Sequence, residues 1–307
     1  MIVITEFMDD AAVGDLTREF QVRYDPDLHG RRNDLLRAAG SAEAIIVRNR
    51  TKVDKQLLEI GGNLKCVGRL GTGLDNIDVG ECRIRGVEVF SGAGINARSV
   101  AEYVIASAFA LVRGSFGFKE KILDGEWPRT EATGSELAGK RLGLVGFGAT
   151  ARATADIATG LGMKTAANDP YLPGDHEHWR RRTERMELTD LLGWCDIASL
   201  HVPLVDSTRH LINADALAKM RPGAILVNAS RGGVADDLAV AQALKSEHLG
   251  GAALDVFETE PLSDEIAGAF KNCPNLILTP HIAGVTQQAN RRVSFAVGKA
   301  VANHLKE

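Results

Sequence analysis

Short apolar runs alternate with helical patterns along almost the whole chain. Runs such as 2–6 (IVITE) and 44–49 (AIIVRN) are apolar nearly throughout, which is typical of strands that are covered on both faces of a parallel sheet. Strand and helix repeated in this order predict a doubly wound α/β fold. The other strands expected in this first part are 20–25, 66–71 and 87–92, with helices at 10–19, 32–39, 54–60 and 77–85.

A second series of strands and helices starts at Lys140. Its strands are expected at 141–146, 164–169, 196–201, 224–230, 251–256 and 276–280. Six strands with helices between them are typical of the Rossmann fold, in which ligands bind outside the carboxyl ends of the strands. The second part of the chain is therefore expected to form its own parallel sheet, with a ligand site at one edge.

The chain of 307 residues is long enough for two domains. A long helical pattern, 97–113, separates the two series, and the last helical pattern, 286–304, has no strand after it. We expect this last helix to pack back on the first series, which makes the first domain discontinuous. The predicted division is 1–95 with 285–307 for one domain and 96–284 for the other.

Charge and composition argue against several classes of protein. The net charge is −4, and the basic cluster Arg180 to Arg182 is interleaved with His and Glu, which is typical of a solvated face rather than a nucleic-acid site. The N-terminal segment has no signal-peptide pattern, and the longest apolar run, 100–112, contains Glu102 and is shorter than the ~20 residues of a membrane span. None of the four cysteines falls in a C-x-x-C pair, so we expect reduced thiols in a cytoplasmic protein, without disulfides or a metal site.

A glycine-rich turn follows the strand 141–146 and opens a helix, in the sequence LVGFGATA. Gly146 permits the tight turn, Gly148 lets the backbone approach a pyrophosphate, and Ala151 is small enough for close packing of the helix on the strand. The N–H groups at the start of the helix, from Ala149 onward, then face the phosphates. The pattern is weak in isolation, but between a strand and a helix it predicts a dinucleotide site.

The end of the next strand selects the dinucleotide. Asp169 follows Gly146 by 23 residues and closes the segment KTAAND. A carboxylate at this place accepts hydrogen bonds from the adenosine ribose hydroxyls and repels the 2′-phosphate of NADP. The predicted cofactor is therefore NAD, with a simple turn aspartate before Pro170 as the alternative for this residue.

Charged residues follow three of the later strands. Arg231, Asp255 and His281 come at the ends of the segments AILVNAS, GAALDV and LILTP, and Glu260 lies in the loop after Asp255. The carboxyl ends of parallel strands meet at one edge of a sheet. We therefore expect these four side chains to gather close to the place of a nicotinamide.

Arginine, glutamate and histidine in one place suit the reduction of a 2-keto acid. Hydride transfer to a ketone leaves an alkoxide, to which a histidinium gives a proton, and neutral histidine takes the proton back in the reverse direction. A neighbouring carboxylate favours the charged imidazolium and orients the ring. The forked guanidinium binds the substrate carboxylate and polarises the adjacent carbonyl. The predicted catalytic residues are Arg231, Glu260 and His281, each of which taken alone could be an ordinary loop or helix-flanking residue.

Several motifs in order give the chain a family resemblance. They are RLGTGLDNID (69–78), NARSVAEY (96–103), LVGFGATAR (144–152), SLHVPLVDSTRHLI (199–212), MRPGAILVNASRGGV (220–234), ALDVFETEPL (253–262) and TPHIAG (279–284). The sequence resembles the D-isomer-specific 2-hydroxyacid dehydrogenases, especially the short branch related to D-3-phosphoglycerate dehydrogenase. The resemblance implies a flavodoxin-like substrate domain, an NAD-binding Rossmann domain, a site in the cleft between them, and a homodimer assembled through the cofactor domain.

The resemblance also assigns roles by position. It implies that the arginine binds and polarises the substrate, that the glutamate assists the histidine as acid and base, and that Asp255 holds the nicotinamide carboxamide. Backbone N–H groups of Leu70 and Gly71 would bind the substrate carboxylate. The other residues expected to line the cofactor are His201, Pro203, Thr208, Ala229 and Gly284.

The first domain carries arginines that suit a second anionic group on the substrate. Arg48 and Arg50 lie at one predicted strand end, in the segment VRNRT, and Arg69 lies at the next. These arginines lead us to expect a small 2-hydroxy acid with an anionic 3-substituent, of the 3-phosphoglycerate or 3-sulfolactate type. The sulfolactate option rests on a similarity of TEFMD and VRNRT to segments of sulfolactate dehydrogenases. Arg48 is the predicted ligand of that substituent, and an ordinary surface arginine is the alternative.

Two other functions stay open on the sequence. The same fold serves in dinucleotide-sensing binding proteins that respond to redox state, but the complete set of arginine, glutamate and histidine argues against such a role. Formate or phosphonate oxidation uses the same superfold and needs further site residues that we do not identify in this sequence.

Overall fold

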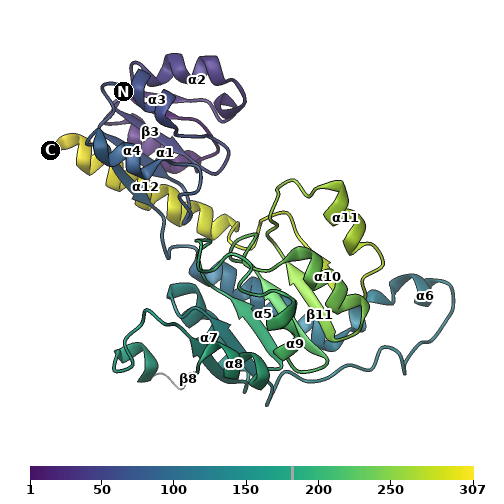
Figure 1. Cartoon of the computed structure of the whole chain (residues 1–307). Helices are drawn as coiled ribbons and strands as arrows, with labels where there is room; N and C mark the ends of the chain where they lie inside the picture. The colour runs from purple at the N-terminus through teal and green to yellow at the C-terminus, as the bar shows by residue number, and fades with distance from the viewer. Residues whose placement is uncertain (181–182) are drawn as a thin grey trace. The chain divides into compact units, whose positions relative to one another are not determined.

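The computed structural model describes residues 1–180 and 183–307, so Arg181 and Arg182 of the basic cluster lie outside the described residues. The chain divides into two compact units (Figure 1). Unit 1 consists of Met1–Asn96 and Val285–Glu307, and unit 2 consists of Ala97–Gly284. Each unit has its own sheet.

Unit 1 contains a five-stranded sheet in the order β2-β1-β3-β4-β5, in which all strand pairs are parallel. Its strands are β1 (Ile2–Ile4), β2 (Val22–Tyr24), β3 (Ala44–Val47), β4 (Cys66–Arg69) and β5 (Glu88–Ser91). Its helices are α1 (Asp10–Thr17), α2 (Arg32–Ala39), α3 (Lys55–Ile60), α4 (Val79–Ile84) and α12 (Gln287–Lys306). This strand order is that of flavodoxin-like sheets, which confirms the predicted fold of the first domain.

Helices cover both faces of the first sheet, which is why its central strands β1 and β3 are apolar and buried throughout. Val3 and Ile45 pack with α2, α3 and α4 on one face, whereas Ile46 packs with α1 and α12 on the other. The contact of α12 with β4 is so close that a Cβ on Gly68 would stand 2.8 Å from Val297. The last helix of the chain is thus part of the core of unit 1.

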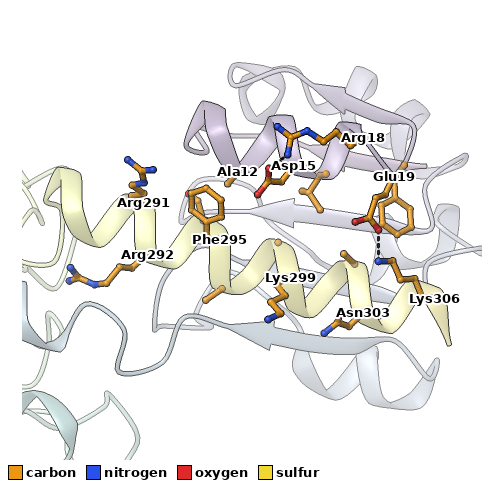
Figure 2. Close-up of a pocket in the computed structure, with 16 residues that line it drawn as sticks. Ala12, Asp15, Arg18, Glu19, Arg291, Arg292, Phe295, Lys299, Asn303 and Lys306 are labelled. Atoms are coloured by element: carbon orange, nitrogen blue, oxygen red, sulfur yellow. Dashed lines mark hydrogen bonds and ion pairs between the residues drawn. The ribbon is translucent and has the colours of Figure 1, made fainter.

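A groove of about 830 Å³ runs between α1 and α12 (Figure 2). Phe295 is among the apolar side chains that line it. At its rim Arg18 pairs with Asp15 at 2.7 Å, and Lys306 pairs with Glu19. The groove lies along helices that cover the sheet rather than at the strand ends, where ligands of doubly wound folds bind.

Unit 2 contains a seven-stranded parallel sheet in the order β12-β11-β10-β9-β6-β7-β8. The strands are β6 (Arg141–Val145), β7 (Lys164–Asn168), β8 (Thr183–Arg185), β9 (Ile197–Leu200), β10 (Ala224–Asn228), β11 (Leu249–Leu254) and β12 (Leu276–Leu278). The strand order reverses at β6, which has β7 on one side and β9 on the other. This reversal is the ligand-binding point of a Rossmann fold, and two doubly wound parallel sheets confirm the predicted fold class.

The edge strand β8 was absent from the prediction, which placed six strands in this sheet. Its three residues, TER, include one buried threonine, and the other two are exposed. Thr183 pairs with Thr165 of β7, and their hydroxyl oxygens lie 3.0 Å apart. An edge strand this short and polar carries no apolar run, so its sequence does not resemble the central strands.

Helices also cover both faces of the second sheet. One face carries α5 (Ala97–Arg113) and α7 (Ala149–Gly160), and the other carries α8 (Leu188–Trp194), α9 (Ala214–Lys219), α10 (Asp237–Lys245) and α11 (Asp264–Phe270). Among the residues that the structure describes, no helix is both long enough and apolar enough to cross a membrane.

An arm with large exposed apolar side chains follows α5. It contains a 3-10 turn (Ser115–Gly117) and α6 (Lys119–Leu123), and Figure 1 shows α6 well away from the sheet of unit 2. Phe116, Leu123 and Trp127 are 75%, 69% and 76% exposed. Apolar groups gathered on one exposed segment are a common property of surfaces that bind another protein.

Candidate active site

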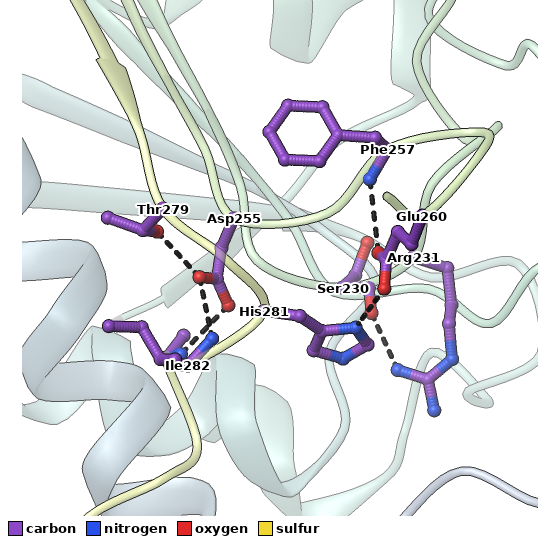
Figure 3. Close-up of polar contacts among 9 residues, drawn as sticks. Ser230, Arg231, Asp255, Phe257, Glu260, Thr279, His281 and Ile282 are labelled. Atoms are coloured by element: carbon purple, nitrogen blue, oxygen red, sulfur yellow. Dashed lines mark hydrogen bonds and ion pairs between the residues drawn. The ribbon is translucent and has the colours of Figure 1, made fainter. Parts of the chain in front are cut away.

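Three neighbouring strands of unit 2 bring the predicted catalytic residues to one edge of the sheet. The strands β10, β11 and β12 lie side by side and run parallel. Arg231 follows β10, Glu260 lies in the loop after β11, and His281 follows β12. Figure 3 shows the three side chains close together.

His281 and Glu260 form a hydrogen bond of 2.8 Å between imidazole Nδ1 and carboxylate Oε2. The other carboxylate oxygen, Oε1, accepts the N–H of Phe257 at 3.2 Å, which orients the carboxylate. Because Nδ1 faces a carboxylate, Nε2 is the ring nitrogen that is left to exchange a proton with a ligand. The side chains of His281 and Glu260 are 41% and 37% exposed, so a small ligand can reach the pair.

Asp255, at the end of β11, holds the loop that carries His281. Its Oδ1 accepts the N–H of Ile282 at 2.8 Å and the hydroxyl of Thr279 at 2.6 Å, and its Oδ2 accepts the N–H of Ala283 at 2.8 Å. These donors compensate the buried carboxylate for lost water. His281 has a φ of +56°, and this left-handed conformation costs a non-glycine residue about 1–2 kcal/mol. The bonds to Asp255 therefore stabilise the strained backbone that presents the imidazole.

Arg231 lies in a loop that packs tightly against the loop after β11. Its Nη1 donates to the carbonyl of Ser230 at 2.6 Å. A Cβ on Gly232 would stand 1.8 Å from the carbonyl oxygen of Phe257, so glycine is required for the two loops to approach this closely. The close packing fixes the backbone of the arginine loop, and Figure 3 shows its guanidinium beside the ring of His281.

Charged residues that the sequence analysis did not single out support the loop after β11. Asp237, in the first turn of α10, is buried and accepts the N–H of Glu258 at 3.2 Å. Burial raises the pKa of Asp237 to about 6. The carboxylate of Glu258 pairs with Arg209 and His210, each at 3.2 Å. An acid in the first turn of a helix is common because it complements the helix dipole, so its identity does not reveal that Asp237 is buried.

The two histidines of the predicted site differ in their ability to donate a proton. His201 follows β9, and its Nε2 lies 2.9 Å from the hydroxyl of Ser199. Burial lowers the pKa of His201 to about 4, so this ring is neutral near pH 7. His281 has a carboxylate partner and an accessible ring, so it is the histidine suited to proton transfer.

The glycine-rich turn lies where β6 ends and α7 begins. Gly146 has a φ of +89°, and a Cβ there would stand 2.6 Å from the carbonyl oxygen of His201. Gly148 precedes α7, and a Cβ there would meet no atom within 4 Å, so the space in front of the helix is open. Ala149 begins the helix, whose first N–H groups have no acceptor within the helix. This open space next to a helix N-terminus fits a pyrophosphate.

Asp169, directly after β7, is held beside this turn. Its Oδ2 accepts the N–H of Phe147 at 2.9 Å, and its Oδ1 accepts the N–H of Tyr171 at 3.0 Å. The carboxylate thus lies next to the glycine-rich turn, as a ribose-binding acid does in NAD-dependent Rossmann folds. The N–H donors at the start of α7 and the carboxylate acceptor of Asp169 together fit NAD.

The other residues predicted to line the cofactor lie in loops after the strands. The hydroxyl of Thr208 donates to the carbonyl of Pro203 at 2.6 Å and accepts the N–H of Val205 at 2.9 Å, so it closes its own loop. Ala229 follows β10, and Gly284 ends the loop of His281. The structure places these residues at the carboxyl edge of the sheet, and their contact with the cofactor stays a prediction.

In unit 1 the segment implied to bind the substrate carboxylate, Leu70 and Gly71, makes hydrogen bonds within the protein. The N–H groups implied to bind the substrate carboxylate are already paired within the protein. Leu70 donates to the carbonyl of Val47 at 2.8 Å, and Gly71 donates to the carbonyl of Arg69 at 2.8 Å. The guanidinium of Arg69 also lies over Gly71, where a Cβ would stand 1.6 Å from Nη1. Both N–H groups have a backbone acceptor within unit 1, and their binding to a substrate carboxylate stays a prediction.

The two arginines of the segment VRNRT differ in their surroundings. Arg48 donates from Nη2 to the Oδ1 of Asn290 at 2.9 Å, and its guanidinium lies 5.7 Å from the ring centre of Phe7. Burial lowers the pKa of Arg48, although the nearby Glu6 opposes this shift. Arg50 is exposed, and its Nη1 lies 3.4 Å from the Nε2 of His29. Arg48 is therefore the more firmly held of the two cations.

Comparison with known proteins gives consistent results. Residues 105–283 match the family model described as "D-isomer specific 2-hydroxyacid dehydrogenase, NAD binding domain". An (S)-sulfolactate dehydrogenase of Chromohalobacter salexigens is 48% identical over 96% of this chain and 94% of that protein. A D-3-phosphoglycerate dehydrogenase of Synechocystis is 36% identical over 84% of this chain, which spans 46% of that longer protein.

A solved structure extends this likeness to the whole fold. The D-lactate dehydrogenase from Aquifex aeolicus, solved with NAD and lactic acid, matches with a TM-score of 0.86 and 25% identity over 100% of this chain and 96% of that one. These relatives are named as dehydrogenases, and none of their names supports a dinucleotide-sensing role. The chain belongs to the D-isomer-specific 2-hydroxyacid dehydrogenases and is an NAD-dependent oxidoreductase.

Proposed function

We propose that the protein interconverts a D-configured 2-hydroxy acid and its 2-keto acid with NAD, and that the substrate carries an anionic group at C3. The observation that carries the reaction type is the bond between His281 Nδ1 and Glu260 Oε2, at the sheet edge that also bears Arg231. Unit 1 serves as the substrate domain, and unit 2 serves as the NAD-binding domain. The family model that matches within unit 2 supports the second assignment.

Each catalytic residue has a separate task in this proposal. Arg231 binds the substrate carboxylate and polarises the C2 carbonyl with its forked guanidinium. His281 gives a proton from Nε2 to the C2 oxygen during reduction and takes it back through Nε2 during oxidation. Glu260 stabilises the imidazolium through Nδ1. NAD, when bound, accepts the hydride from C2 or supplies it as NADH.

The cofactor residues follow from the open turn at the start of α7. Gly146, Gly148 and Ala149 hold the pyrophosphate, and Asp169 binds the adenosine ribose. Further contacts are assigned to His201, Pro203, Thr208, Ala229, Asp255 and Gly284. Asp255 has a second task in this assignment, because both of its oxygens already hold the loop of His281.

Arg48 binds the anionic 3-substituent in this proposal. The relatives named for sulfolactate and for 3-phosphoglycerate both act on acids of that kind, which supports the assignment. The (S) label of sulfolactate is consistent with a D-specific family. A sulfonate-bearing carbon outranks the carboxyl in naming priority, so the spatial arrangement of D-lactate is called S in sulfolactate.

A substrate panel tests the proposed function. We expect NAD-dependent oxidation of 3-phosphoglycerate or (S)-sulfolactate with a kcat/KM well above that for D-lactate. Arg48→Gln should lower kcat/KM for the anionic substrate by about tenfold or more, because a charge-assisted hydrogen bond is lost, and should leave D-lactate little changed. Arg50→Gln is the matched control. A wild-type protein that prefers D-lactate would contradict the anionic 3-substituent.

We also propose a homodimer that works in the cytoplasm. The exposed Phe116, Leu123 and Trp127 of the arm after α5 fit a subunit interface. The four cysteines are free thiols in the structure, which suits a reducing compartment. A mass in solution near twice that of the chain would support the dimer.

A further inference from the structure

A buried carboxylate lies under the loop that carries Arg48. Glu6 follows β1 and is 4% exposed. Its Oε1 accepts the backbone N–H groups of Arg48 at 2.8 Å and Thr51 at 3.0 Å, and its Oε2 accepts that of Arg50 at 3.1 Å. Both oxygens of one side chain thus bind the backbone that begins where β3 ends.

The same loop is held from its carbonyl side. The amide nitrogen of Asn76 donates to the carbonyl of Arg48 at 2.9 Å and to that of Thr51 at 2.6 Å. The hydroxyl oxygens of Thr51 and Thr5 lie 2.7 Å apart. A loop fixed through both its N–H and its C=O groups keeps one backbone conformation, which sets where the side chain of Arg48 begins.

The guanidinium of Arg48 is held in turn. The Oδ1 of Asn290, in α12, accepts a hydrogen bond from the Nη2 of Arg48. The ring centre of Phe7, the residue after Glu6, lies 5.7 Å from the central carbon of the guanidinium. The negative charge of Glu6 also favours the charged guanidinium, against the effect of burial. A cation that is partly desolvated and held in one place loses little entropy when it binds an anion.

We propose that Glu6 is a positioning residue that sets the preference for an anionic 3-substituent, by holding the loop from which Arg48 reaches the substrate. This inference rests on the proposed function. It also explains a motif that the catalytic residues leave unused, since Glu6 and Phe7 belong to TEFMD and the arginines belong to VRNRT. The two segments form one unit, in which the carboxylate organises the cation.

The test is Glu6→Gln, read as a ratio of two kcat/KM values in one preparation, (S)-sulfolactate over D-lactate. Gln replaces one carboxylate oxygen with an NH₂ group, which cannot accept a backbone N–H, so at least one of the three bonds is lost. We expect the ratio to fall about tenfold, toward that of Arg48→Gln. A ratio does not depend on the fraction of folded protein, so lower stability alone does not change it.

Two comparisons show whether Glu6 acts through Arg48. In the Arg48→Gln background, Glu6→Gln should leave the ratio unchanged, because the cation it positions is gone. Glu43→Gln is the matched control in the same unit, since Glu43 is a surface carboxylate that pairs with the N-terminus and Lys65. Should Glu6→Gln fail to fold, Asn290→Ala removes the acceptor of the same guanidinium and should lower the ratio severalfold.

The outcomes separate this inference from the proposed function. A wild-type protein that does not prefer (S)-sulfolactate or 3-phosphoglycerate over D-lactate overturns the proposed substrate class, and the role of Glu6 with it. A wild-type preference that falls in Arg48→Gln but persists in Glu6→Gln overturns the role of Glu6 alone. The role of Glu6 is also overturned if Glu6→Gln lowers the ratio of the two kcat/KM values by the same factor in the wild-type background and in the Arg48→Gln background.

Discussion

Replacing His281 with alanine is expected to lower kcat for 2-keto acid reduction by about 10²- to 10⁴-fold. The variant keeps Arg231 and the glycine-rich turn, so it should still bind substrate and NADH. The alanine variant has no group in place of Nε2 to protonate the C2 oxygen, so the alkoxide takes its proton from water, which is a slower step. Steady-state kinetics with NADH and the 2-keto acid measure this loss.

A histidine at the amino ends of the strands, away from the candidate site, provides the control. His248 precedes β11, and its Nε2 lies 2.9 Å from the carbonyl of Leu217. His248→Ala removes an identical ring from unit 2 without touching the candidate site, and kcat should stay close to that of the wild type. Retention of most of the wild-type kcat by His281→Ala would remove His281 from its assigned role.

The second large effect is expected for Arg231→Lys. Lysine keeps the positive charge but loses the planar fork that binds a carboxylate and polarises the neighbouring carbonyl. We expect kcat/KM for the 2-keto acid to fall by about 10²- to 10³-fold, with little change in the KM for NADH. Competition with a non-reacting 2-hydroxy acid analogue would show whether substrate binding is lost together with the rate.

Arg221→Lys is the corresponding control. Arg221 pairs with Asp196 at 3.5 Å near the amino ends of the strands, so the same exchange there leaves the candidate site intact. Wild-type kinetics for Arg231→Lys would show that the fork has no part in binding or polarising the substrate.

The apolar strands and the glycine-rich turn were enough to predict both sheets of the fold. Central strands of a parallel sheet are buried on both faces, so their sequences are distinctive. The strand β8 was not predicted, because this edge strand has the sequence TER and contains no apolar run. Its partner Thr165 lies in a strand that was predicted, so the error concerns the edge of the sheet and not its architecture.

The meeting of the three candidate side chains was predictable because parallel strands deliver their carboxyl ends to one edge. Loop geometry was not predictable in the same way. The bond from the N–H of Leu70 to the carbonyl of Val47, and the support of Glu258 by buried Asp237, depend on how segments distant in sequence pack together. The three bonds of Glu6 are of the same kind, since a glutamate just after a strand is usually a solvated residue.

The most direct test of the central claim is a double-mutant cycle between Glu260→Gln and His281→Ala. In this account Glu260 acts through the imidazole of His281, whose Nδ1 lies 2.8 Å from Oε2. We expect Glu260→Gln to lower kcat for 2-keto acid reduction about tenfold when His281 is present, because a charge-assisted hydrogen bond is lost. In the His281→Ala background the same change should leave kcat unchanged, because the group that Glu260 assists is gone. A loss of equal size in both backgrounds, or no loss in either, would contradict the pairing of His281 with Glu260 as the proton-transfer group.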